Sequence, residues 1–177
     1  MDGDDSQRTR FERVFQAHHP AVRAYALRRT DANTAQDVVA ETFLIAWRRS
    51  DVLPDDPLPW LFETARRVLA NQRRGAAHQR SLADRLAAEP VAAARDIGDA
   101  LASASACRAA LARLGERDRE TLMLVAWEEL EPGAAARASG CSRAAFAVRL
   151  HRARRRFRHE LDLAGLVPGT LNKLEAA

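Results

Sequence analysis

The strongest constraint on the fold is the segment Ser142–Arg158, which has seven arginines and no acidic residue. Its apolar residues step by four, three and four positions, which is the spacing of one helix face: Phe146, Leu150, Ala153 and Phe157. Four residues then point away from that face: Val148, His151, Arg152 and Arg155. The chain has 28 basic and 24 acidic residues, so without this segment it is slightly acidic. A packed helix with a cationic face favours phosphate binding, because neutralising phosphates releases counterions. A solvated basic helix is the alternative.

The residues before this segment have the pattern of a short helix followed by a tight turn. Pro132 suits a first helical turn, where its missing N–H would be unpaired anyway. Gly140 suits the left-handed position that ends a helix, and Ser142 suits the N-cap of the next helix. The layout is that of a helix-turn-helix, which an ordinary helical hairpin shares. The charge of the second helix makes DNA binding the preferred interpretation.

Composition predicts an all-α protein, because Ala, Leu and Arg dominate and strand signals are nearly absent. We expect no membrane insertion and a cytoplasmic location, since there is neither a long uncharged apolar run nor a recognisable leader. Cys107 and Cys141 lack metal-binding spacing and are expected to be reduced. No catalytic pair, phosphate loop or metal cluster is recognisable, so we expect neither an enzyme nor a cofactor or metal.

The apolar pattern predicts two small helical domains joined by a linker, with the helix-turn-helix in the second. The predicted parts are a disordered N-terminus, a helical domain, a linker, a helix-turn-helix domain and a tail, at residues 1–10, 11–76, 77–102, 103–162 and 163–177. A capping box at Ser81–Asp84 allows a short helix within the linker. For the tail, a helix, a partner-binding extension and a flexible segment all remain open.

Two helices of the first domain have distinctive polar faces. In Thr34–Arg49, Thr34 and Asp37 are spaced as a capping box. Three charged residues lie opposite the apolar face of this helix: Asp37, Glu41 and Arg48. Capping is the alternative role for Asp37, whereas Glu41 has no such local duty and is the better candidate for an intermolecular salt bridge.

The second helix, Trp60–Arg74, is cationic on one side. That side contains Arg66, Arg67, Ala70, Asn71, Arg73 and Arg74. Trp60, at its start, either packs into the core or stacks on a splayed base, and the core is the preferred interpretation.

Four segments occur in order: AQDVVAETFLIAW, PWLFETARR, ALARLGERDRETLMLV and GCSRAAFAVRLHRARRRFRHEL. Together they resemble the small extracytoplasmic-function (ECF) bacterial sigma factors, which keep only sigma regions 2 and 4. The resemblance covers roughly Phe11–Leu161 and is specific because the motifs share the family's order. It implies a sigma factor that binds core RNA polymerase and promoter DNA, and it suggests an anti-sigma factor as a further partner.

The resemblance also implies roles for individual residues. Residues 35–43 match the region 2.2 helix, which docks on the polymerase β′ clamp, so the implied polymerase contacts are Asp37, Glu41 and Arg48. The helix Trp60–Arg74 matches the part that opens and reads the −10 element, and its implied DNA contacts are Trp60, Arg66, Arg67, Asn71 and Arg74. The preceding loop, Ser50–Pro59, corresponds to the part that captures a flipped base.

For region 4 the resemblance implies contacts with the −35 element. The implied contacts are Arg143, Arg149, His151, Arg152 and Arg155. Ala147 and Val148 stand where the family often has polar residues facing DNA, so we expect strong positioning and modest base reading. Arg149 lies nearer the core flank, which favours a phosphate contact. Arg156 and Arg158 are expected to be solvent or backbone charges.

Two other functions fit parts of the pattern. An ordinary helix-turn-helix regulator would act without core polymerase and use the first domain for dimerisation or sensing. The second basic helix and the acidic helix before it argue against this. A helical adaptor that binds only protein fits the seven-arginine helix poorly.

Overall fold

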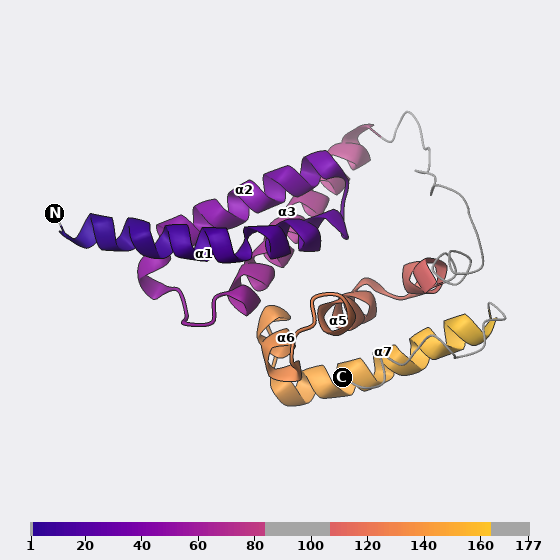
Figure 1. The fold of residues 1–177 in the computed structure, drawn as a ribbon. Helices are drawn as coiled ribbons and strands as arrows, with labels where there is room; N and C mark the ends of the chain where they lie inside the picture. The colour runs from indigo at the N-terminus through magenta and orange to yellow at the C-terminus, as the bar shows by residue number, and fades with distance from the viewer. Residues whose placement is uncertain (1, 84–106, 164–177) are drawn as a thin grey trace, which may run out of the picture. The chain divides into compact units, whose positions relative to one another are not determined.

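The computed structural model describes residues 2–83 and 107–163, and all regular elements in these ranges are helical. This confirms the all-α prediction. The chain divides into two compact units, Met1–Glu89 and Pro90–Ala177 (Figure 1), and the division falls inside the predicted linker. Most of that linker, the end of its predicted capping box and the tail after Leu163 lie outside the described residues. None of the described helices is long and apolar enough to cross a membrane.

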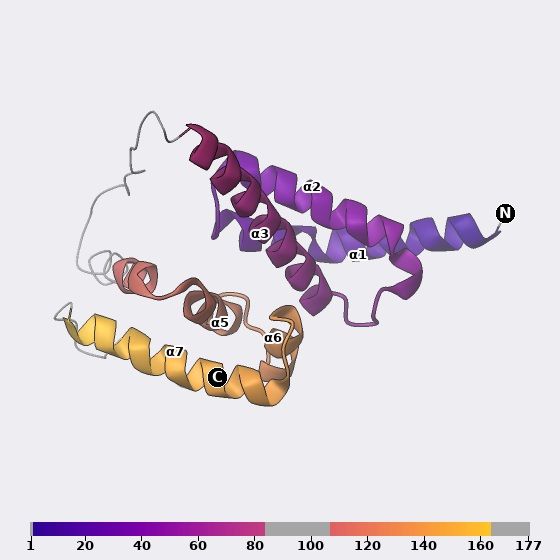
Figure 2. The same ribbon diagram turned by 180° about the vertical axis from the view of Figure 1, so that it is seen from behind.

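The first unit is a three-helix body. It contains α1 (Asp2–Leu27), α2 (Ala32–Arg48) and α3 (Leu58–Ala83), with a short 3-10 turn, η1 (Ser50–Val52), after α2. α1 and α2 lie side by side, and α3 packs against both (Figures 1 and 2). Residues 77–83, which the sequence assigned to the linker, continue α3.

Apolar side chains from all three helices form the core of the first unit. The rings of Tyr25 and Phe62 stack with their centroids 4.8 Å apart. The side of α3 opposite its cationic residues is buried, at Leu61, Ala65, Val68 and Leu69. Burying a large apolar side chain contributes about 1.5–3 kcal/mol, so this face holds α3 against α1 and α2.

The N-cap of α2 is Asp31, three residues before Thr34, where the sequence predicted the cap. The Asp31 carboxylate accepts hydrogen bonds from the backbone N–H groups of Asn33 and Thr34, each at 3.0 Å, and from the Thr34 hydroxyl at 2.7 Å. The predicted capping box of Thr34 and Asp37 is therefore wrong. The Asp31 carboxylate already satisfies two of the amides that a helix leaves unpaired at its start. The Thr34 hydroxyl and these amides lower the pKa of Asp31 to about 2.

α1 includes residues 2–10, for which the sequence predicted disorder. The polar composition of this segment gives no hydrophobic signal, but its last residue is held by distant partners. Arg10 donates hydrogen bonds to the carbonyls of Ser50 and Leu53 in the loop after α2. The Phe11 ring meets the Trp47 ring edge-on, with centroids 5.1 Å apart. Tertiary contacts therefore fix α1 at Arg10 and Phe11.

The second unit begins, in its described part, with a helical segment at residues 107–113. It continues with α5 (Glu116–Ala126), α6 (Pro132–Ala138) and α7 (Arg143–Leu163). α5 and α6 both pack against α7 (Figures 1 and 2). The predicted apolar stripe of α7 is confirmed as its inner face, with Phe146, Leu150, Ala153 and Phe157 all buried.

The turn between α6 and α7 confirms the predicted helix-turn-helix. Pro132 occupies the start of α6. Gly140 has a φ of 64°, a left-handed conformation that glycine adopts without a steric penalty. The hydroxyl of Ser142 accepts a hydrogen bond from the Ala145 N–H at 3.2 Å and so caps α7. Pro132, Gly140 and Ser142 therefore each have the structural role that the sequence predicted.

Candidate nucleic-acid interface

The outward side of α7 is a cationic surface. Of the predicted contacts, His151, Arg152 and Arg155 are exposed on it, Arg143 is exposed at the start of the helix, and Arg149 is half-buried. Val148, on the same side, is 52% exposed. Because α7 has no acidic residue before Glu160, no carboxylate of the helix offsets these arginines along most of its length. The surface can therefore neutralise several phosphates of a DNA backbone.

A hollow of about 520 Å³ lies beside this surface. Its lining comes from α5 and α7: Asp118, Ala144, Ala145, Val148, Arg149, Arg152 and Arg156. Arg149 and Arg152 thus share one concave site, in which Arg149 is the less exposed. This position of Arg149 agrees with its predicted place at the core flank of the helix.

Arg156 has a structural role that the sequence did not predict. Its guanidinium forms an ion pair with the carboxylate of Asp118, in the first turn of α5. Asp118 is only 8% exposed, and a buried carboxylate is costly unless it is paired. A second, longer ion pair joins Glu160 to Arg113 at 3.8 Å. Both pairs connect α7 to neighbouring helices, so they help to set the orientation of its cationic side.

The second predicted DNA surface lies on α3, in the other unit. Arg67, Asn71 and Arg74 are exposed there, whereas Trp60 and Arg66 are half-buried. Arg67 forms an ion pair with Glu63 at 2.6 Å, and Arg74 donates a hydrogen bond to the side-chain oxygen of Asn71. These contacts lie within α3 and restrain the side chains while leaving them at the surface. Trp60 is neither fully buried nor fully exposed, so its ring is accessible in part.

The loop between α2 and α3 has buried ends and an exposed middle. Ser50, Leu53 and Pro57 are buried, whereas Val52 is 67% exposed. The other exposed residues between α2 and α3 are Arg49, Asp51, Pro54, Asp55 and Asp56. Burial lowers the pKa of His18 in α1, and the carboxylate of Asp56 opposes that shift. The loop is therefore anchored to the domain and presents three carboxylates together with the apolar side chains of Val52 and Pro54.

The three predicted polymerase contacts lie on one stripe of α2 together with Leu44. We call this set the α2 stripe: Asp37, Glu41, Leu44 and Arg48. All four are exposed. Because Asp31 caps the helix, Asp37 has no capping role and its carboxylate belongs to the surface. Sequence reasoning missed Leu44, which is 47% exposed. Its signal was its spacing, since positions 37, 41, 44 and 48 share one helix face.

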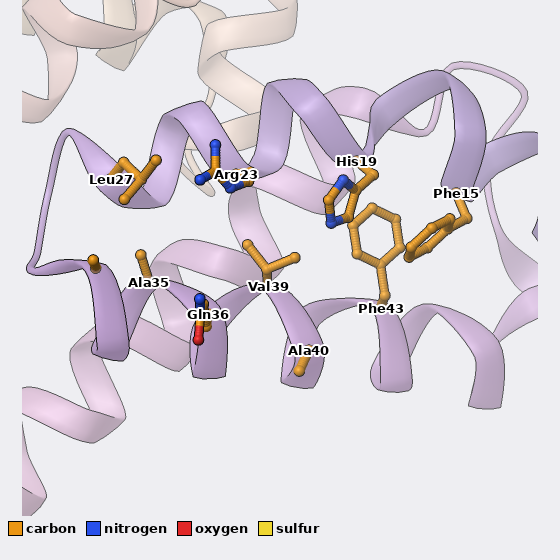
Figure 3. A pocket seen from close by; sticks show the side chains of 10 residues that line it. Phe15, His19, Arg23, Leu27, Ala35, Gln36, Val39, Ala40 and Phe43 are labelled. Atoms are coloured by element: carbon orange, nitrogen blue, oxygen red, sulfur yellow. The ribbon is translucent and has the colours of Figure 1, made fainter.

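An apolar groove of about 450 Å³ borders the α2 stripe (Figure 3). Phe15 and His19 of α1 lie against Phe43 at one end of the groove, with ring centroids 4.8 Å and 5.9 Å from that of Phe43. Gln36 and Ala40 line it from α2. These two residues directly precede Asp37 and Glu41, so the groove and the stripe are adjacent surfaces of one helix.

Among the described residues, no group of three or more His, Cys, Asp or Glu side chains is arranged to hold a metal ion. Cys107 and Cys141 are free thiols, and burial raises the pKa of Cys107.

These features define a two-unit helical protein with a helix-turn-helix in its second unit. Residues 14–79 match the family model of sigma-70 region 2, and residues 106–157 match that of sigma-70 region 4. The ECF RNA polymerase sigma factor SigL of Mycobacterium tuberculosis is 37% identical over 108 residues, which cover 52% of this chain and 61% of SigL. The two family models together span two thirds of the chain, which belongs to the sigma-70 family.

Solved structures show the same fold. The sigma factor RpoE from Bartonella quintana, determined in complex with the anti-sigma factor NepR, has a TM-score of 0.67 and 26% sequence identity. That match covers 86% of this chain and 96% of RpoE. CnrH, determined in complex with the cytosolic domain of CnrY, has a TM-score of 0.58 and 24% identity over 86% of this chain and 88% of CnrH. The likeness to CnrH is one of fold.

Proposed function

We propose that this protein is a sigma factor that binds core RNA polymerase and directs promoter recognition and transcription initiation. In this proposal the first unit opens and reads the −10 element, and the second unit reads the −35 element. The observation that carries the proposal is the presence of both sigma regions, in order, on one chain whose matched helices expose cationic surfaces. Action on promoter DNA places the protein in the cytoplasm.

At the −35 element, α7 acts mainly by positioning. Arg143, Arg152 and Arg155 are exposed and suited to phosphates and to guanine edges. Ala147 and Val148, exposed between them, offer only apolar contact, for which the thymine methyl is the partner. Most of the binding free energy then comes from the DNA backbone and depends strongly on salt.

At the −10 element, opening the duplex requires binding and no catalysis. Unpairing a base costs a few kcal/mol, which contacts to the splayed base repay. The arginines of α3 attract the strand, while the accessible part of Trp60 and the exposed loop after α2 are placed to meet bases. Free energy of binding to the open strand thus shifts the equilibrium toward the open promoter.

The α2 stripe is the proposed polymerase contact. Asp37, Glu41 and Arg48 offer charges for intermolecular salt bridges, and Leu44 supplies an apolar centre among them. An exposed apolar residue flanked by charged residues has the composition of a small interface, in which a polar rim surrounds an apolar contact.

We further propose that an anti-sigma factor controls the protein. The complex of RpoE with NepR supports this by likeness, and the groove between α1 and α2 supplies a physical basis. A partner helix with apolar side chains in this groove would lie against Gln36 and Ala40. It would then cover the adjacent α2 stripe, so the anti-sigma factor and the polymerase would compete.

Run-off transcription with bacterial core polymerase on genomic promoter fragments tests the proposal. We expect new specific transcripts in the presence of the protein. Glu41→Arg should weaken binding to core polymerase, whereas Arg152→Glu should leave core binding intact and abolish the promoter-specific transcripts. Glu12→Arg and Arg13→Glu, which make the same charge changes at exposed positions of α1, serve as matched controls and should transcribe normally.

Two results would contradict the proposal. A chain that binds DNA but never binds core polymerase would be an ordinary helix-turn-helix regulator. A chain that binds neither, at any salt concentration, would be a protein-binding adaptor.

A further inference from the structure

Arg10 connects α1 to the loop that follows α2. Its Nη1 donates a hydrogen bond to the Ser50 carbonyl at 3.0 Å, and its Nη2 donates one to the Leu53 carbonyl at 2.5 Å. These carbonyls flank η1, so one guanidinium holds both ends of the turn. The fork of an arginine is suited to two acceptors because its N–H groups have fixed relative directions.

Neighbouring contacts anchor both segments that Arg10 connects, α1 and the loop after α2. The Phe11 ring packs on the Trp47 ring, which anchors the adjacent turn of α1 to the end of α2. The Ser50 hydroxyl donates a hydrogen bond to the Trp47 carbonyl at 2.9 Å, and the Leu53 side chain is buried. With its ends held, the turn presents Asp51 and Val52 to solvent.

We propose that Arg10 is a positioning residue for −10 recognition, an inference that rests on the proposed function. Its guanidinium keeps the loop between α2 and α3 in the conformation that meets a base before DNA arrives. When a loop must become ordered on binding, the measured affinity for DNA is the intrinsic affinity multiplied by the fraction of time that the loop spends in the binding conformation. Arg10 lies before residues 14–79, the part of the chain that matches region 2, so the match itself assigns it no role.

The test compares three variants in the full chain. Arg10→Ala removes both hydrogen bonds, and Arg10→Lys keeps the charge but offers one donor nitrogen in place of the guanidinium. Arg13→Ala is the matched control, because Arg13 is exposed on the same helix and its hydrogen bond goes to Thr9 within that helix. Circular dichroism verifies that each variant retains its helices.

Two readouts separate positioning from general stability. Hydrogen–deuterium exchange on the free chain measures the order of residues 49–57. With core polymerase bound, affinity is measured for a single strand carrying the −10 segment and for a duplex carrying only the −35 segment, both from a promoter found by run-off transcription. For Arg10→Ala we expect faster exchange in the loop and about 5- to 10-fold weaker binding of the single strand. Binding of the −35 duplex should stay within about twofold, and Arg10→Lys should fall between Arg10→Ala and the wild type.

Equal exchange and equal single-strand affinity in Arg10→Ala and Arg13→Ala would overturn the inference. An equal loss for the −10 strand and the −35 duplex would also overturn it, since a positioning residue acts on one element. If Arg10→Ala loses its helices, Arg10→Lys supplies the comparison. A wild-type chain that fails to bind core polymerase overturns the proposed function instead, and the exchange measurement still decides whether Arg10 orders the loop.

Discussion

A single carboxylate determines where α2 begins. Asp31 caps the helix through Asn33 and Thr34, and these bonds lower its pKa from the ordinary 3.8 to about 2. A carboxylate whose pKa is lower in the folded state stabilises that state when it is ionised. Its contribution is complete above about pH 4, where it is ionised in both states, and is lost as the pH falls toward 2.

Asp31→Asn tests this pH dependence. The variant keeps a capping oxygen but cannot titrate, so we expect the wild type to melt at a higher temperature at pH 5 and this advantage to shrink between pH 4 and 2. Thermal unfolding followed by circular dichroism across this pH range measures it. Asp37→Asn, which changes a carboxylate that does not cap α2, should show no comparable trend, and an unchanged advantage at pH 2 would contradict the assignment.

At the scale of elements, each key helix combines a buried face with a surface for a partner. α7 packs Phe146 and Phe157 inward and exposes Arg152 and Arg155 on the other side. Rotation of α7 about its own axis would bury charged side chains. The packing of its inner face therefore also determines the direction in which its cationic face points. The ion pair of Arg156 with Asp118 adds a directional contact to this packing.

Arg156→Ala tests that contribution. It leaves the Asp118 carboxylate buried without its partner, for which we expect a loss of about 1–3 kcal/mol in the free energy of unfolding of the second unit. Amide exchange across α7 in the full chain measures this loss. Arg155→Ala removes a neighbouring exposed arginine and should change stability by less than about 0.5 kcal/mol. Equal losses in the two variants would show that the ion pair does not stabilise the unit.

At the scale of the whole molecule, the basic residues that give the net charge of +4 are unevenly distributed along the chain. Seven arginines lie in one segment of the second unit, and a smaller cationic surface lies on α3 of the first. In the proposed function, two units that each bind DNA weakly gain effective concentration because one tether brings both to the same promoter. Binding should therefore depend on salt through both surfaces together.

Substitutions in both units test this joint action. With core polymerase bound, Arg152→Ala and Arg74→Ala should each reduce the slope of log K against log salt concentration by about 1, and the double variant by about 2. Titrations on one promoter duplex at several salt concentrations measure the slopes. Arg13→Ala should leave the slope unchanged, and a double variant no different from a single one would show that only one unit binds the backbone.

The residues with local signals were predictable. The α7 stripe, the left-handed Gly140 and the Ser142 cap were all read correctly, because each depends on residues within a few positions. The start of α2 was predicted wrongly because Asp31 and Thr34 both suit an N-cap, and in the structure the Asp31 carboxylate accepts the bonds from the first backbone amides. Leu44 was missed because an apolar residue on a helix is first assigned to the core.

The sequence by itself determined the all-helical class, the turn between α6 and α7 and the cationic face of α7, since helix periodicity and capping act over short separations. Only the tertiary structure decided that Arg10 holds the carbonyls of Ser50 and Leu53, and that Arg156 pairs with Asp118. The partners in these contacts are 38 to 43 positions apart. No local pattern encodes which buried acceptor meets which guanidinium, because that choice follows from how the packed helices bring distant segments together.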